Sequence, residues 1–189
     1  RGGVTHRFLT DCSGQPVDAN NTCTVTPTPV QSAIDFANPS ETVYLGAGTF
    51  EEEIEISKNL NLQGTTGSVI QSPVSIDVDF VRSNDNRAII YVNNADVTID
   101  NIIVDGLGRG NANYRFIGIG FYNASGTISN NKITGITDTP FSGAQHGNAI
   151  YVYNDDGVAR EVNIVNNEIN EFQKNGITAN GDDLTANIE

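Results

Sequence analysis

Five charged residues in the second half of the chain have the side-chain types that acid–base chemistry uses. They are Arg109, Arg115, His146, Asp155 and Asp156. An arginine beside an acidic proton can act as a base or neutralise a carboxylate, while histidine and carboxyl groups donate and accept protons. No short motif joins these five candidates into one arrangement, so the sequence leaves the catalytic residues unknown.

Three of these candidates also have a plain structural interpretation. His146 lies among glycine, serine and glutamine residues, a composition typical of a solvated loop. Asp155 and Asp156 precede Gly157, and aspartate followed by glycine commonly forms a turn. The structural interpretation and the catalytic one both stay open.

A second acidic pair, Asp182 and Asp183, raises the question of a metal site. Aspartate carboxylates and neighbouring carbonyl oxygens are ligands that calcium prefers. The same two residues also suit an ordinary turn. Calcium is therefore the one cofactor that the sequence leaves open.

The elements that position these residues come from an internal repeat with a spacing of roughly 27 to 31 residues. Each copy opens with isoleucine and has asparagine or glycine four positions later; the copies begin at Ile90, Ile119, Ile150 and, more weakly, Ile177. A second pattern follows in the first three copies, over residues 98–101, 127–130 and 163–166. Apolar residues at every second position place one face of a short strand in a core.

Units of this kind cannot bury their apolar faces alone, but stacked units can. The repeat therefore predicts an all-β fold, a right-handed parallel β-helix solenoid. Asn101, Asn130 and Asn166 occupy equivalent turn positions in the repeat. We expect these three asparagines to stack as an internal structural ladder at one corner.

The same register predicts a ribbon of side chains on the outer face of the first strand of each repeat. Alternation places tyrosine and amide side chains there, and the ligand-binding candidates are Tyr91, Asn93, Tyr122, Tyr151, Tyr153 and Asn180. Aromatic rings stack on the apolar faces of sugars, and amides bond to sugar hydroxyls. A polysaccharide is thus a candidate ligand, although tyrosine also suits a β-surface without any ligand.

Residues 1–27 lack periodicity, and we interpret them as a loop-rich N-terminal segment. They contain Cys12 and Cys23, which can close a short disulfide loop or remain free thiols. A disulfide indicates an oxidising, extracellular setting. The segment also contains Asn20, which with Asn123 is one of two matches to the glycosylation sequon.

A single short helix is predicted over residues 29–37, ahead of strands that start at about residue 42. Thr28 can cap it, Pro29 suits the first turn, and Gln31 can complete a capping box. Its apolar stripe needs a surface, and the open first rung offers one. The helix would therefore cap the β-helix, which extends over residues 28–189.

The stretch Val30 to Gly64, VQSAIDFANPSETVYLGAGTFEEEIEISKNLNLQG, resembles the opening of many pectin-lyase-like β-helix proteins. These include pectin methylesterases and repeat-bearing bacterial and archaeal surface proteins. Enzymes of this family hold their polysaccharide on the strand face where the tyrosine ribbon is expected. The pectin methylesterase pattern, a glutamine followed by paired aspartates in consecutive rungs, is not found.

Length and charge limit the remaining possibilities. A chain of 189 residues fits one domain, and a formal charge of −13 argues against nucleic acid or an anionic membrane as partner. No apolar run approaches the ~20 residues that a membrane-spanning helix needs. Membrane insertion is therefore not expected.

Ile188 aligns with Ile164, so the sequence ends in mid-rung. We expect either a longer chain or self-association through this open C-terminal rung.

These features are consistent with two alternative functions. The first is an extracellular, non-catalytic module of a cell-surface or appendage protein that serves assembly or glycan adhesion. The second is a secreted lyase, hydrolase or epimerase that acts on uronate-type glycans.

Overall fold

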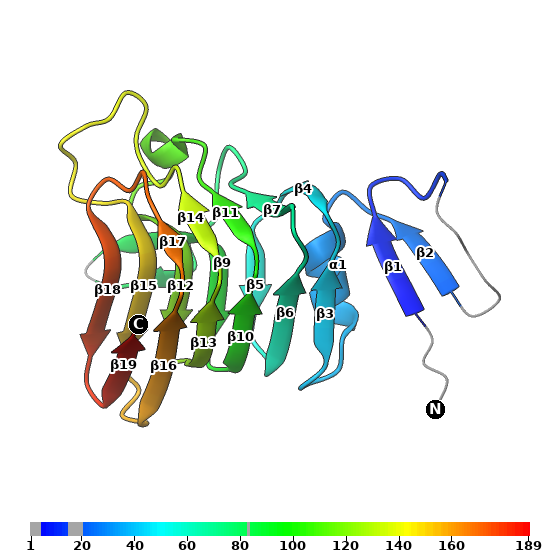
Figure 1. Cartoon of the computed structure of the whole chain (residues 1–189). Helices are drawn as coiled ribbons and strands as arrows, with labels where there is room; N and C mark the ends of the chain where they lie inside the picture. The colour runs from blue at the N-terminus through cyan, green and yellow to red at the C-terminus, as the bar shows by residue number, and fades with distance from the viewer. Residues whose placement is uncertain (1–4, 15–20, 83) are drawn as a thin grey trace.

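The computed structural model describes residues 5–14, 21–82 and 84–189. Most of these residues form three parallel sheets wound around one core, and a small two-stranded sheet projects at the N-terminal end (Figure 1). The architecture is an all-β, right-handed parallel β-helix, as the repeat predicts. The sequon at Asn20 lies outside the described residues.

Each turn of the solenoid contributes strands to three sheets. Sheet 1 consists of β3 (Thr42–Leu45), β6 (Leu60–Gly64), β10 (Asp96–Asp100), β13 (Ser125–Ser129), β16 (Arg160–Val165) and β19 (Leu184–Ile188). Sheet 2 consists of β4 (Gly48–Glu51), β7 (Ser68–Gln71), β11 (Ile103–Asp105), β14 (Lys132–Thr134) and β17 (Glu168–Ile169). Sheet 3 consists of β5 (Ile54–Ile56), β9 (Asp85–Asn93), β12 (Phe116–Tyr122), β15 (Asn148–Asn154) and β18 (Asn175–Gly181).

The strand register matches the repeat. In sheet 3 the paired isoleucines are Ile90, Ile119, Ile150 and Ile177. In sheet 1 the pairing joins Ile99, Ile128, Ile164 and Ile188. Side chains that repeat in the sequence therefore stack directly above one another in space.

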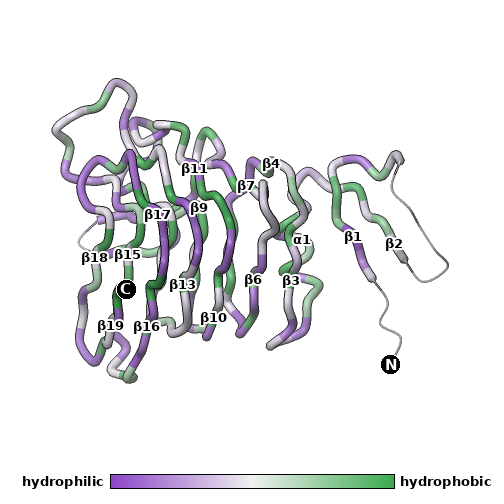
Figure 2. The backbone as a smooth tube through the Cα atoms, viewed as in Figure 1, coloured by the Kyte–Doolittle hydropathy of each residue, from purple (hydrophilic) through white to green (hydrophobic). Residues whose placement is uncertain are grey.

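The core is filled by these inward-facing columns. Ile90, Ile99, Ile119 and Ile128 are each 0% exposed. Burying one such side chain contributes roughly 1.5–3 kcal/mol relative to leaving it in water. In Figure 2 hydrophobic and hydrophilic segments alternate along the strands, as expected for strands with one buried face.

Asn101, Asn130 and Asn166 do not form the predicted internal ladder. Their backbones are left-handed, with φ angles of 57°, 55° and 54°, and the three residues are exposed. Asparagine tolerates this conformation better than most residues, so these positions make the corner between sheets 1 and 2. The corner was predicted at the right place, but the expected inward direction of these side chains is wrong.

The internal ladder lies one residue later, at Asn131 and Asn167. Asn131 is 2% exposed; its Oδ1 accepts from the N–H of Ile102 at 3.0 Å, and its Nδ2 donates to the carbonyl of Ile99 at 2.9 Å. The Oδ1 of Asn167 in turn accepts from the N–H of Asn131 at 3.0 Å. Buried backbone groups at the corner thus gain partners that strand pairing cannot supply.

The predicted helix is present as α1 (Pro29–Phe36), with Val30 and Ile34 buried against the first rung. Its N-terminus is capped in an unexpected way. Thr28 makes no side-chain cap bond. Instead, the buried carboxylate of Glu52 accepts from the N–H of Val30 at 3.1 Å and of Gln31 at 3.0 Å.

The predicted capping box is absent because Gln31 is used elsewhere. Its Oε1 accepts from the N–H of Glu55 at 2.8 Å, and its Nε2 donates to Asp35 at 2.9 Å. A carboxylate brought close by the fold therefore replaces the local cap that the sequence pattern indicates. Among the residues that the structure describes, no helix is long and apolar enough to cross a membrane.

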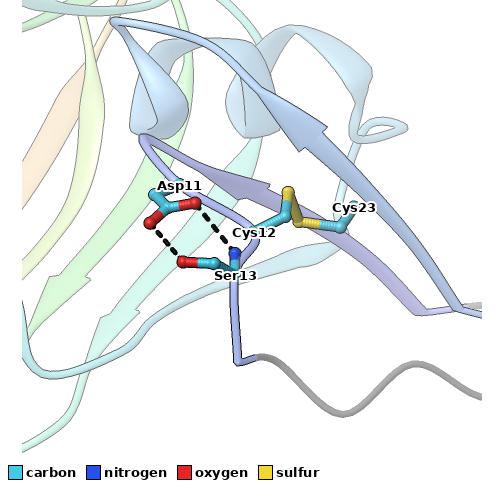
Figure 3. Close-up of a disulfide and its surroundings, with 4 residues drawn as sticks. All are labelled: Asp11, Cys12, Ser13 and Cys23. Atoms are coloured by element: carbon cyan, nitrogen blue, oxygen red, sulfur yellow. Dashed lines mark hydrogen bonds between the residues drawn. A yellow bond between two sulfur atoms is a disulfide. The ribbon is translucent and has the colours of Figure 1, made fainter.

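The N-terminal segment is more regular than the sequence indicates. Its described residues include β1 (Thr5–Leu9) and β2 (Asn21–Val25), which pair in parallel, and together we call these strands the arm. The predicted disulfide between Cys12 and Cys23 is present, with the Cα atoms 6.1 Å apart (Figure 3). The arm contacts the body through α1, where the Phe36 ring lies 4.2 Å from that of His6.

Candidate functional site

The outer face of sheet 3 carries the tyrosines in the predicted columns. Tyr91, Gly120 and Tyr151 are paired neighbours in one column, which ends at Thr178. The second column contains Asn93, Tyr122, Tyr153 and Asn180. All of these positions point away from the solenoid core, as alternation requires.

The predicted solvent-facing ribbon is nevertheless partly covered. Residues 72–82, which we call the strap, contain β8 (Phe80–Val81), and β8 pairs antiparallel with the start of β9. The Phe80 ring stacks on Tyr122 at 4.6 Å and on Tyr91 at 5.7 Å between centroids. The guanidinium of Arg82 lies 4.6 Å from the Tyr153 ring centroid.

The four tyrosines point outward as predicted, but the strap keeps two of them from solvent. Tyr91 is 3% exposed and Tyr153 is 4% exposed, whereas Tyr122 and Tyr151 are half-buried. Burial raises the pKa of the Tyr91 hydroxyl above its ordinary value of 10.0, so it stays protonated. A second apolar cluster lies outside the main core and contains Phe80, Ala88, Tyr91, Ile117, Tyr122 and Tyr151, and Tyr153 stacks on Tyr151. The amide candidates are less covered, since Asn93 is partly exposed and Asn180 is exposed.

The strap also brings carboxyl groups together beside Tyr91. Asp79 accepts from the N–H of Ala88 at 2.5 Å. Burial, and to a smaller extent the negative charges of Glu53 and Glu55, together raise the pKa of Asp79 to about 8, against the opposing effects of that hydrogen bond and of Arg87. This carboxyl group is therefore largely protonated at neutral pH. The sequence contains no signal for it, because the strap does not follow the repeat.

The two arginine candidates lie in the connection between β11 and β12. Arg109 starts the short 3-10 helix η1 (Arg109–Asn111), and its guanidinium pairs with Glu51 at 3.1 Å and with the carbonyl of Ser72. Arg115 precedes β12 in a left-handed conformation, with φ of 57°, and is half-buried. Arg109 thus joins a loop to the preceding rungs.

His146 lies in the loop between β14 and β15 as expected, but it is buried, so the prediction that it is solvated is wrong. It is 4% exposed, and its Nε2 lies 3.3 Å from the Oδ1 of Asp138, which is 6% exposed. Asp138 also accepts from Ser142 and, at 3.2 Å, from the Nε2 of Gln173. The Tyr114 ring packs 5.2 Å from the imidazole. This network connects two loops to the next rung, and its burial keeps His146 away from a polymer.

Asp155 lies in the turn after β15 and is hydrogen-bonded there. Its N–H donates to the Oδ1 of Asn123 at 2.8 Å, and its Oδ1 accepts from the Nδ2 of Asn123 at 3.1 Å. Arg82 of the strap lies 3.9 Å from the other carboxylate oxygen. Because Asn123 is 7% exposed and its amide is bonded, the second glycosylation sequon is buried.

The turn between β18 and β19 contains Asp182 and Asp183. The carbonyl of Asp182 accepts from the Nδ2 of Asn154 at 2.7 Å, and Asp183 has a left-handed backbone with φ of 53°. Within the described part of the chain, no group of three or more His, Cys, Asp or Glu side chains is placed to hold a metal ion. Calcium binding here stays a prediction.

A groove that the sequence did not indicate runs across the outer face of sheet 1; we call it the sheet-1 groove. Its volume is about 470 Å³, and it is lined by Asp96, Ser125, Gly126, Thr127, Ala159, Arg160, Glu161, Asn163 and Thr185. The turns before β10, β13 and β19 have two residues each, whereas the turn before β16 covers residues 155–159. The longer turn supplies Ala159 and leads into Arg160, which form one wall.

Arg160 is held in place at this wall. Its guanidinium pairs with Asp156 at 2.5 Å, and the side chain of Arg160 is 18% exposed. The Arg160 guanidinium lowers the pKa of the Asp156 carboxyl, so that carboxyl stays charged. The Nε of Arg160 is buried and has no hydrogen-bond partner among the described residues. Asp156, a catalytic candidate in the sequence, therefore positions Arg160.

The other groove residues offer a dense set of hydrogen-bonding groups. Thr127 and Asn163 are neighbours in one outward column of sheet 1, and Ser125 lies in the adjacent column. Asp96 and Glu161 add carboxylates. Such a mixture of hydroxyl, amide, carboxylate and guanidinium groups is complementary to an array of sugar hydroxyls, which both donate and accept hydrogen bonds.

No protein-family model and no curated protein significantly matches the sequence of this chain. Among solved structures, the chain is similar to a crystal structure of a pectin methylesterase mutant in complex with a hexasaccharide. The identity is 11% and the TM-score 0.47, over 84% of this chain and 49% of that one. The chain thus spans about half the length of that protein.

Proposed function

We propose that this chain is an extracellular, non-catalytic β-helix module that binds a neutral polysaccharide in the sheet-1 groove. The observation that carries the proposal is the groove itself. It combines a volume of about 470 Å³ with hydroxyl, amide, carboxylate and guanidinium groups on its walls. Arg160, whose guanidinium is fixed by Asp156, lines one wall of it.

Charge argues for a neutral ligand over a uronate. Asp96 and Glu161 line the groove, and Arg160 is already paired with Asp156. The formal charge of the whole chain is −13. A polyuronate would meet repulsion from these carboxylates at low salt, whereas a neutral polymer would not. The preferred ligand is therefore a neutral glycan with several free hydroxyl groups.

The non-catalytic assignment is supported by what the candidate catalytic residues do. Arg109 pairs with Glu51, His146 is buried against Asp138, and Asp156 pairs with Arg160. Each of these contacts connects parts of the fold, so none of these side chains needs a substrate to explain its position. The Cys12–Cys23 disulfide supports an extracellular setting, since such bonds persist in oxidising compartments.

Binding and catalysis can be separated with one polysaccharide panel. The panel contains soluble neutral glucans, mannans and xylans beside polygalacturonate and alginate, and each is scored for retention in affinity electrophoresis and for product release. We expect retention by at least one neutral polymer and no release of reducing or unsaturated ends. Binding confined to the uronates, or product release from any polymer, would contradict the proposal.

A matched pair of variants locates the site. Asn163→Ala removes an amide from the groove, whereas Asn61→Ala removes one from the same outward column, beyond the groove. We expect Asn163→Ala to weaken binding about 5- to 10-fold, the loss of roughly one hydrogen bond. Asn61→Ala should bind as the original does. Equal effects of both variants would place the ligand elsewhere.

Self-association through the last rung remains a separate prediction. Among the described strands, β18 and β19 each pair with a neighbour on one side only, and Ile188 is 56% exposed. Exposed strand edges of this kind favour pairing with another chain. Light scattering across a concentration series measures it directly, independently of the glycan panel.

A further inference from the structure

A second groove, unrelated to sugar chemistry, lies between the arm and the first rung; we call it the arm groove. Its volume is about 760 Å³. Residues 5–9 of β1 form one wall, residues 42–45 of β3 form the other, and apolar residues of α1 also line it, including Pro29, Val30 and Ala33. Figure 1 shows β1 and β3 running in the same direction on either side of this space.

The wall formed by β3 is a strand edge. β3 ends the six-stranded order of sheet 1 and pairs only with β6 among the described strands. The carbonyls of Glu41 and Leu45 accept from residues of the β6 side, so the backbone groups of alternate residues point that way. The N–H and C=O groups of Thr42 and Tyr44 consequently point into the arm groove.

The wall formed by β1 is a second strand edge. The carbonyl of Leu9 accepts from the N–H of Thr26 at 3.0 Å, which places its backbone toward β2. Alternation then turns the backbone groups of His6 and Phe8 to the opposite side. That side is the groove, because no described residue of β2 lines it.

The separation of these two edges is braced on the arm side. The Cys12–Cys23 disulfide ties the end of β1 to β2, as Figure 3 shows. The Phe36 ring of α1 lies 4.2 Å from His6 and 5.7 Å from Phe8 between centroids. The disulfide keeps β1 and β2 together as one unit, and closure of that unit onto β3 would disrupt the Phe36 contacts that hold it against α1.

We propose that the arm groove binds one extended segment of a partner polypeptide by β-strand addition. Backbone groups of that segment would pair with Thr42 and Tyr44 on one side and with His6 and Phe8 on the other. It would join the arm and sheet 1 into one continuous sheet, an arrangement that needs β1 and β3 to lie two strand spacings of about 4.7–4.9 Å apart. One face of the segment meets α1 and the other meets solvent, so its side chains should alternate apolar and polar.

A peptide probe tests this inference directly. The probe is acetyl-Asp-Val-Thr-Ile-Asp-amide, the sequence of β10, which alternates in the required way and already pairs within sheet 1. Its control is the same peptide with N-methyl groups on the valine and isoleucine nitrogens, which removes backbone donors. On the full chain labelled with ¹⁵N, we expect saturable binding of the first peptide and at least 10-fold slower amide exchange at His6, Phe8, Thr42 and Tyr44.

A matched pair of variants shows whether the backbone carries the binding. Tyr44→Pro deletes the N–H that faces the groove, at an edge position where proline is tolerated. Tyr44→Ala removes the same exposed ring but keeps the N–H. We expect Tyr44→Pro to lose at least 10-fold in affinity relative to Tyr44→Ala, with unchanged melting temperatures.

Three results would overturn the inference. Unchanged amide exchange at saturating peptide would exclude strand addition, as would equal binding by the two Tyr44 variants. Protection of the same four amides in the protein alone, rising with concentration, would make the occupant a second copy of this chain rather than a partner. Tight binding of the N-methylated control would mean that side chains alone carry recognition.

Discussion

The protonation of Asp79 should control whether the strap stays closed over the tyrosines. Its carboxyl group lies between β9 and the acidic end of β5, where Glu53 and Glu55 approach it and Arg87 only partly compensates. Burial raises the pKa of Asp79 to about 8 when the strap is closed, against 3.8 for an ordinary aspartate. The closed strap therefore holds a proton that the open strap releases.

The direction of the pH effect follows from this difference. A group with a higher pKa in the closed state stabilises that state fully below pH ~4 and loses this contribution as pH rises through about 8. One pH unit of difference in pKa corresponds to about 1.4 kcal/mol, so the upper limit is about 6 kcal/mol. The strap can open without unfolding the solenoid, and Phe80 burial contributes only roughly 1.5–3 kcal/mol. Between pH 6 and 9 the difference in the Asp79 pKa removes roughly 3 kcal/mol of closing free energy, which is enough to offset the burial of Phe80.

The chain contains 0 tryptophan residues, so its near-ultraviolet circular dichroism reports on tyrosine packing. Between pH 6 and 9 we expect the tyrosine signal to fall with a midpoint near 8, while the far-ultraviolet signal stays constant. Asp79→Asn keeps the acceptor for the Ala88 N–H and removes the charge, so its signal should not change. Asp77→Asn, an exposed position of the same strap, is the matched control and should titrate like the original. A flat profile in the original protein, or the same midpoint in Asp79→Asn, would refute this reasoning.

Two further predictions concern the contacts that the fold adds to the repeat. Glu52→Ala should lower the free energy of unfolding by about 2 kcal/mol, because two helix N–H groups lose a charged acceptor. Urea denaturation measures this loss. A value below about 0.5 kcal/mol would mean that water replaces the Glu52 cap. Asn131→Ala should cost about 2–3 kcal/mol, since it orphans buried backbone groups of Ile99 and Ile102. The exposed corner variant Asn166→Ala should cost only about 1 kcal/mol, from left-handed strain, and equal losses would contradict the ladder assignment.

Local pattern was sufficient for the solenoid. Alternation and an asparagine at each corner specify which side chains enter the core, and the pairing of Ile119 with Ile90 and Ile150 follows from repetition alone. The helix over Pro29–Phe36 was equally accessible, because its signals lie within one turn of the chain. The Cys12–Cys23 disulfide was predicted correctly, with free thiols as the alternative, because the sequence contains only these two cysteines.

The burial and surroundings of the candidate site residues depend mainly on contacts between separate parts of the chain. The strap has no repeat, so nothing in its sequence indicates that Phe80 and Arg82 cover the tyrosines. His146 looked solvated because the loop that contains it is covered by Tyr114 and bonded to Gln173, both of which come from other parts of the chain. The sheet-1 groove exists because one turn is longer than its counterparts and projects beside them.

The division has a physical cause. The buried face of a strand is set by an alternation with a period of two residues, which is visible in the sequence itself. The exposure of an outer face depends on whether a loop folds back over it, and that is settled by the packing free energy of groups such as Phe80. The sequence by itself thus determined the scaffold and the columns of this protein, while only the tertiary structure decided which column meets solvent and which is covered.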